Sequence, residues 1–207
     1  MRLHYHPLSS YSRKAALGIA LRGDPVELVT VDALGGQLKG DAYRALSPFG
    51  KMPVLELDDG TGVFESTSIL EYLEELGPRR LIPAGKERFV RHYDRLGDLY
   101  LLDPIGAYFW DKSTDVRDEA VARTSTAWTL WERELADGRP FLCGDEISLA
   151  DLSAAIASHY AWTEGLPLSG AIRAYRARLE GHPAVAASAA AAAPFVEATK
   201  SKRVPRE

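Results

Sequence analysis

The sequence predicts a small mixed α/β domain followed by an all-helical domain. Short apolar runs typical of strands alternate with helical patterns through the first part of the chain. No convincing strand follows Lys86, where long helical patterns take over. The 207 residues suit two modest domains, so we expect domains at 1–78 and 86–207, joined by a linker at 79–85.

The chain opens with a strand, a helix and a second strand. Residues 2–6 form the first strand candidate. Ser9 or Ser10 precedes a helical run that ends at Gly23. The β-branched stretch at residues 26–31 then favours a second strand. This order predicts a β-α-β unit.

The next elements centre on Pro53, after a short helix expected at residues 41–46. Pro53 has no N–H, so it suits the start of a strand, here residues 54–57. Met52, which precedes it, is biased toward an extended conformation. A cis Met52–Pro53 bond turns the chain sharply and exposes the N–H and C=O of Met52. In the commoner trans form, Pro53 simply opens the strand.

A hairpin and a helix complete the first half. The Asp-Gly turn within residues 58–62 returns the chain through residues 62–64. Ser66 suits the N-cap of a helix that runs through Leu76 and stops at Gly77 and Pro78. The free N–H groups at such an N-terminus attract anions, although Ser66 can also serve as a cap alone.

The second half consists of helical patterns. Pro104 is expected to kink or divide the first of them. Ser148 as N-cap and Asp151 three residues later form a capping box, with Ile147 and Leu152 as a hydrophobic staple. The tail from Lys200 is basic and expected to be loose. The helical patterns cover residues 86–112, 116–136, 148–160, 170–179 and 184–193.

Composition narrows the class of protein. The formal charge of −4 argues against nucleic acid or an anionic membrane as the main partner. No apolar run is long enough to span a bilayer, and the N-terminus reads as a strand rather than a signal peptide. Cys143 is the single cysteine, which excludes an internal disulfide and a CxxC motif. His4 and His6 alternate along a strand without a third ligand, so we expect no metal site. These features predict a cytoplasmic protein.

Three motifs in this order resemble those of the cytosolic glutathione S-transferases. Residues 51–55 (KMPVL) are similar to the family's cis-proline segment, Glu65 and Ser66 to its γ-glutamyl-binding pair, and residues 148–151 to the capping box of its helical domain. The resemblance spans nearly the whole chain. It implies a thioredoxin-like N-terminal domain and an all-α C-terminal domain.

The resemblance also implies how glutathione is held. The backbone of Met52, beside Pro53, pairs with the cysteinyl part as an added strand. Glu65 takes the γ-glutamyl ammonium, and Ser66 takes its carboxylate. Lys51 faces the glycyl carboxylate, or is a solvated loop lysine.

The residue that activates the thiol is expected in the first strand-to-helix turn. A hydroxyl donor at a helix N-terminus stabilises a thiolate. The turn resembles those of the serine-type classes, and Ser9 aligns best with their serine. Ser10 is an alternative, as are Tyr5, Tyr11 and Ser12. The turn has no cysteine, which disfavours a protein-thiol mechanism. The paired serines resemble the zeta class, which isomerises maleylacetoacetate, but Tyr11 stands where that class has a cysteine.

The resemblance implies a second substrate beside the first long helix of the helical domain. Tyr108 and Trp110 are the candidates for a pocket that takes small apolar electrophiles, although residues at this spacing also serve as core. A homodimer is expected as well. The predicted function is conjugation of glutathione, as co-substrate, to such electrophiles. The alternatives are a non-catalytic glutathione-binding or protein-interaction module, or a glutathione-dependent isomerase.

Overall fold

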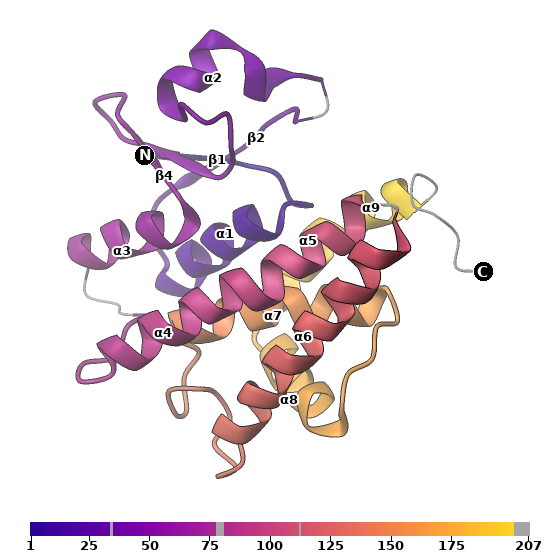
Figure 1. Cartoon of the computed structure of the whole chain (residues 1–207). Helices are drawn as coiled ribbons and strands as arrows, with labels where there is room; N and C mark the ends of the chain where they lie inside the picture. The colour runs from indigo at the N-terminus through magenta and orange to yellow at the C-terminus, as the bar shows by residue number, and fades with distance from the viewer. Residues whose placement is uncertain (34, 78–80, 112, 201–207) are drawn as a thin grey trace. The chain divides into compact units, whose positions relative to one another are not determined.

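The computed structural model describes residues 1–33, 35–77, 81–111 and 113–200. The chain divides into two compact units, Met1–Leu81 and Ile82–Glu207. In Figure 1 the first unit runs from indigo to magenta, and the second continues to yellow. Some predicted features lie outside the described residues. They are the helix stop at Pro78, the first part of the linker, Lys112 and the basic tail after residue 200.

The first unit is built on a four-stranded sheet in the order β2-β1-β3-β4. The central strand β1 is parallel to β2 and antiparallel to β3, and β3 is antiparallel to β4. Leu3 on β1 lies opposite Leu28 and Leu55. A parallel pair needs a crossover connection, which α1 supplies. The strands are β1 (Arg2–Tyr5), β2 (Glu27–Thr30), β3 (Val54–Glu56) and β4 (Gly62–Phe64).

Helices cover both faces of this sheet (Figure 1). On one face α1 and α3 pack so closely that a Cβ at Gly18 would collide with the side chain of Leu70. The absence of a side chain at Gly18 therefore allows this packing. On the other face a small core forms around Val31, Tyr43 and Val54 beneath α2. The helices are α1 (Ser10–Arg22), the 3-10 helix η1 (Gln37–Lys39), α2 (Asp41–Leu46) and α3 (Ser66–Leu76).

The local signals of the first unit act largely as the sequence predicts. Ser9 is the N-cap of α1, and Gly23 ends that helix in the left-handed conformation at φ 73°. The prediction for Ser66 was wrong: Ser66 is the first residue of α3, and the preceding Glu65 occupies the N-cap position. The helix therefore begins with no side-chain cap, since Glu65 makes no capping hydrogen bond.

A buried ionic network joins the ends of α1 and α3. The guanidinium of Arg22 pairs with Glu74 and with Asp24, and it donates to the Leu73 carbonyl at 2.5 Å. The Glu74 carboxylate also accepts from the Leu81 N–H at 2.8 Å. Breaking a buried pair leaves an uncompensated charge, so this network holds the two helices in register.

The described part of the second unit is helical apart from one isolated bridge between Phe141 and Gly144. Pro104 lies in the first turn of α5, directly after the π-helical turn η2, so the first long pattern is divided as predicted. The last helix continues through Pro194, beyond the predicted end at residue 193. The elements are α4 (Glu87–Gly97), η2 (Asp98–Leu102), α5 (Asp103–Trp110), α6 (Thr114–Glu134), α7 (Leu149–Thr163), α8 (Gly170–Glu180) and α9 (Pro183–Lys200).

The predicted capping box organises the start of α7. The fully buried Asp151 accepts from the N–H of Ser148 at 2.9 Å and from its hydroxyl at 2.7 Å. The same carboxylate accepts from the Leu142 N–H and the Tyr175 hydroxyl. One carboxylate thus joins α7, α8 and the segment before α7. Within the described ranges, no helix has both the length and the apolar character required to cross a bilayer.

Candidate active site

The loop before β3 is held by two hydroxyl groups. The Lys51 carbonyl accepts from Ser47 Oγ at 2.8 Å and from the Tyr43 hydroxyl at 3.0 Å. The next peptide bond, Met52–Pro53, is cis. In the described part of the chain, the N–H and C=O of Met52 have no hydrogen-bond partner. Met52 therefore offers a donor and an acceptor to an extended peptide, as in strand addition.

The start of α3 combines an unusual backbone with an N-cap residue, Glu65, whose side chain makes no capping hydrogen bond. Glu65 has φ 71° and ψ 122°, and it is the one described non-glycine residue with positive φ. Such a conformation costs energy, and residues that adopt it cluster at active sites and ligand-binding sites. Ser66 follows as a buried residue at the first helical position. The N-terminus of α3 is thus suited to a carboxylate, with the Glu65 side chain exposed beside it.

Lys14 adds a positive charge at the same helix terminus. Its side chain is fully buried, and its ammonium donates to Thr67 Oγ1 at 2.9 Å. Sequence reasoning missed this residue. The available signal was a lysine followed by the apolar Ala15 and Leu17 within the buried part of α1.

The first strand-to-helix turn places Ser9 at the N-terminus of α1. Ser9 Oγ accepts from the Ser12 N–H at 3.3 Å. An N–H donor occupies a lone pair and leaves the hydroxyl proton of Ser9 free to be donated. Ser10 is the first residue of α1 and is half-buried. Ser12 is fully buried, and its hydroxyl has no partner in the described ranges.

Tyr5 lies at the end of β1, where its carbonyl accepts from the Val31 N–H at 2.9 Å. Its side chain is half-buried. Tyr11 is also half-buried, in the first turn of α1. The structure therefore places five hydroxyl groups in or next to the turn, of which Ser9 occupies the N-cap.

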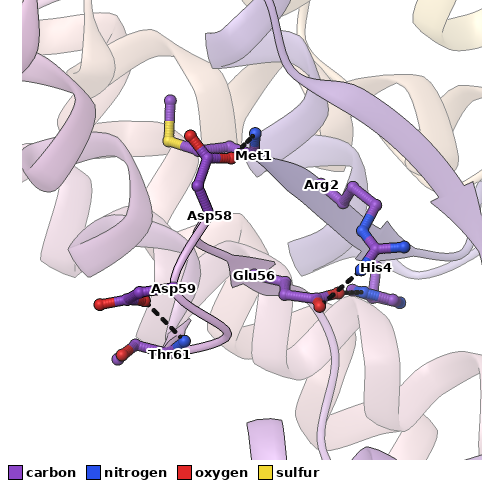
Figure 2. Close-up of polar contacts among 7 residues, drawn as sticks. All are labelled: Met1, Arg2, His4, Glu56, Asp58, Asp59 and Thr61. Atoms are coloured by element: carbon purple, nitrogen blue, oxygen red, sulfur yellow. Dashed lines mark hydrogen bonds and ion pairs between the residues drawn. The ribbon is translucent and has the colours of Figure 1, made fainter.

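Glu56 and two basic side chains form a polar cluster at one end of β1 and β3 (Figure 2). Glu56 accepts from Arg2 at 2.6 Å, and its other oxygen lies 2.6 Å from His4 Nε2. The hydrogen bond with His4, followed by the contacts with Arg2, lowers the pKa of the Glu56 carboxyl. Among the described residues no group of histidine, cysteine and carboxylate side chains could hold a metal ion.

Tyr108 and Trp110 lie on α5 in the second unit. Tyr108 is 8% exposed, and the Arg117 guanidinium lies 4.8 Å from the centre of its ring. Trp110 is 64% exposed. The structure thus buries one of these two aromatic side chains in its unit and exposes the other.

Comparison with known proteins identifies both halves of the chain. The model for the glutathione S-transferase N-terminal domain matches residues 8–76, and that for the C-terminal domain matches residues 114–187. Glutathione S-transferase theta-2B of Homo sapiens is 32% identical over 198 residues, which cover 84% of this chain and 78% of that protein.

Two further matches extend over most of the chain. Glutathione S-transferase 2 of Saccharomyces cerevisiae is 28% identical over 205 residues, which cover 89% of this chain and 88% of that protein. A crystal structure of a glutathione S-transferase domain-containing protein from Marinobacter aquaeolei aligns with a TM-score of 0.79 at 26% identity, over 89% of this chain and 100% of that one. The sheet order, the helical second half and these matches agree, and the chain belongs to the glutathione S-transferase family.

Proposed function

We propose that the protein binds glutathione in its first unit and conjugates the glutathione thiolate to small apolar electrophiles. The observation that carries this proposal is the Met52 backbone, which is unpaired while the preceding carbonyl is fixed by two hydroxyls. Met52 N–H and C=O take the cysteinyl part of glutathione as a short antiparallel strand. The family to which the chain belongs supports the same ligand.

The ends of the tripeptide bind on either side of Met52. The γ-glutamyl carboxylate docks on the first N–H groups of α3 and the Ser66 hydroxyl, where the helix dipole favours a negative charge. Glu65 is exposed beside this terminus and pairs with the ammonium group of the same residue. Lys51 is exposed and pairs with the glycyl carboxylate.

Ser9 stabilises the thiolate. A free thiol has a pKa of about 8.5, and a hydroxyl donor together with a helix N-terminus lowers it. Ser9 Oγ accepts from the Ser12 N–H, which leaves the Ser9 hydroxyl able to donate its proton to the sulfur. The thiol proton leaves to solvent. The thiolate then forms a sulfur–carbon bond with the electrophile, and the leaving group departs with its electron pair. Bringing the two substrates together supplies much of the remaining rate.

Tyr108 and Trp110 are the proposed contacts for the apolar electrophile, and a homodimer is the proposed assembly. Aromatic side chains suit an apolar ligand. The exposed Trp110 has the ring surface to offer such a ligand, whereas Tyr108 already packs within its unit.

The test compares Ser9→Ala with Ser10→Ala in glutathione titration calorimetry and in conjugation of a chloronitrobenzene. We expect Ser9→Ala to retain glutathione binding and to lose kcat/KM on the order of 10²-fold, because one preorganised donor is removed. The apparent pKa of the bound thiol in the pH profile should rise. Ser10→Ala should change little.

Ser9→Ala also removes the N-cap of α1, and losing an N-cap costs about 1 kcal/mol of stability. A second variant that loses a cap elsewhere is therefore needed as a control. Ser169→Ala removes the cap of α8, where the hydroxyl accepts from the Ile172 N–H at 3.2 Å. Because the Ser169 hydroxyl also donates to Glu132, this variant should lose at least as much stability as Ser9→Ala but no conjugation rate. Full activity of Ser9→Ala with loss in Ser10→Ala would reassign the donor. Retained glutathione binding without turnover on a broad panel of electrophiles would favour a binding module, and absence of binding would overturn both functions.

A further inference from the structure

We propose that Tyr43 and Ser47 are positioning residues that fix and polarise the Lys51–Met52 peptide bond, and so set the strength with which Met52 binds the backbone of glutathione. This inference rests on the proposed function and adds two residues to it. Neither side chain needs to touch the ligand.

The geometry converges on one peptide group. The Lys51 carbonyl accepts from Ser47 Oγ at 2.8 Å and from the Tyr43 hydroxyl at 3.0 Å, while the Lys51 N–H donates to Ser47 Oγ at 3.3 Å. The Gly50 N–H closes the turn on the Ser47 carbonyl at 2.8 Å. Ser47 and Tyr43 are 1% and 5% exposed, so water competes little for these hydrogen bonds.

The peptide bond transmits the effect. The Lys51 carbonyl and the Met52 N–H belong to one planar amide, so a fixed carbonyl also fixes the direction of the N–H. Donation to a carbonyl strengthens the N–H of the same amide by roughly 10–30%, because hydrogen bonds in a chain polarise one another. Two donors on Lys51 therefore orient Met52 and make it a better donor to a ligand carbonyl.

Tyr43 is held independently of any ligand. Its ring packs in the small core with Val31 and Val54, and the edge of the His4 ring faces it at 6.3 Å between centroids. His4 is itself fixed by Glu56 in the cluster of Figure 2. Burial raises the pKa of Tyr43 to about 12, so its hydroxyl keeps the proton throughout the range in which a glutathione thiolate forms.

The experiment measures glutathione affinity and kinetics for Tyr43→Phe, Ser47→Ala and the double variant. Each hydroxyl lost should raise the glutathione Kd and KM about two- to threefold, because the lost bond is present in both free and bound protein and only its effect on the Met52 N–H changes the affinity. At saturating glutathione, kcat should stay within about twofold and the apparent pKa of the bound thiol should not move, because Ser9 is untouched. The double variant should lose less than the product of the single effects, since both hydroxyls act on one carbonyl.

Two controls separate positioning from other effects. Tyr72→Phe removes a hydroxyl from a half-buried tyrosine of α3 and should leave Kd unchanged. S-methylglutathione, which has no thiol, should show the same loss of affinity in Tyr43→Phe as glutathione does. A loss confined to glutathione itself would overturn the proposal.

The outcomes also distinguish this inference from the proposed function. If wild-type protein fails to bind glutathione, the proposed function fails. If wild-type protein binds and Tyr43→Phe binds equally well, the proposed function stands and the positioning role is wrong. Tyr43→Phe keeps the aromatic ring in the small core. If Ser47→Ala fails to fold, the glutathione affinity of Tyr43→Phe therefore decides whether the positioning role is right.

Discussion

The ammonium of Lys14 lies 2.9 Å from Thr67 Oγ1, and this contact joins the middle of α1 to the first turn of α3. Lys14 is fully buried, which is rare for a lysine and requires polar partners. Thr67 directly follows Ser66 at the helix terminus proposed to bind the γ-glutamyl carboxylate. Lys14 therefore places a positive charge next to the site of an expected negative charge.

Replacing Lys14 by methionine should weaken glutathione binding about tenfold. Methionine keeps an unbranched chain of similar length but removes the charge, which is worth about 1 kcal/mol or more near a partly buried carboxylate. Calorimetry at two salt concentrations measures the effect. Lys86→Met removes an exposed lysine that donates to the Cys143 carbonyl in the second unit, and its affinity should equal that of the wild type. Equal affinity in Lys14→Met would contradict the prediction.

Alanine at Gly50 should damage the site more than alanine at Gly60. Both glycines have positive φ, 60° and 84°, so both substitutions cost about 1 kcal/mol of backbone energy. A Cβ at Gly50 would also lie 2.7 Å from the Leu38 carbonyl oxygen, whereas one at Gly60 meets nothing within 4 Å. Urea unfolding should show a loss of more than about 2 kcal/mol for Gly50→Ala and about half of that for Gly60→Ala. Gly50→Ala should also weaken glutathione binding, because it displaces the loop that carries Met52.

Stability should depend on the charge of Glu56. Its folded-state pKa is lowered by His4 and Arg2, so the stabilisation is present above the ordinary carboxyl pKa and is lost as pH falls through the folded pKa. Glu56→Gln should lose about 0.5–1 kcal/mol at neutral pH, a modest value because Arg2 is half-exposed. Thermal unfolding across pH should show the gap to wild type closing in acid.

Asp58→Asn is the matched control for Glu56→Gln. Asp58 pairs with the N-terminal ammonium of Met1 at 2.7 Å, but its side chain is 89% exposed (Figure 2). We expect the thermal unfolding midpoint of Asp58→Asn to be almost the same as that of the wild type. A gap between Glu56→Gln and wild type that persists unchanged in acid would show that the carboxyl charge is not the cause.

Asp151→Asn should destabilise the second unit by roughly 3 kcal/mol or more. One Asp151 oxygen accepts from Leu142 and Tyr175 and the other from Ser148, and in asparagine an NH₂, which cannot accept, replaces one of these two oxygens. Buried donors would then lose their acceptor. Urea unfolding measures the loss, and the exposed Asp145→Asn should stay within about 0.5 kcal/mol of wild type. A loss below about 1 kcal/mol would contradict the prediction.

The local signals in the sequence predicted much of the fold. Ser9, Gly23 and the Ser148 capping box mark helix ends in the structure as expected, because caps act within one helical turn. Pro104 divides a long helix because a proline lacks the N–H needed inside a helix, which is also a local effect. The predicted end of the last helix was wrong, since α9 continues through Pro194. The alanine-rich stretch before Pro194 favours helix strongly.

The sequence by itself determined the order of the elements, the two-part architecture and the motifs around Pro53 and Ser66. These depend on residues close together in the chain. The tertiary structure alone decided the contact of Lys14 with Thr67, the positive φ of Glu65 and the two hydroxyls on the Lys51 carbonyl. The Lys14 contact joins residues 53 positions apart, and the pairing of buried polar groups depends on how helices and strands pack. Tyr43 and Ser47 lie only eight and four residues before Lys51, but the loop that brings them to its carbonyl is fixed by the packing of Tyr43 in the small core with Val31 and Val54.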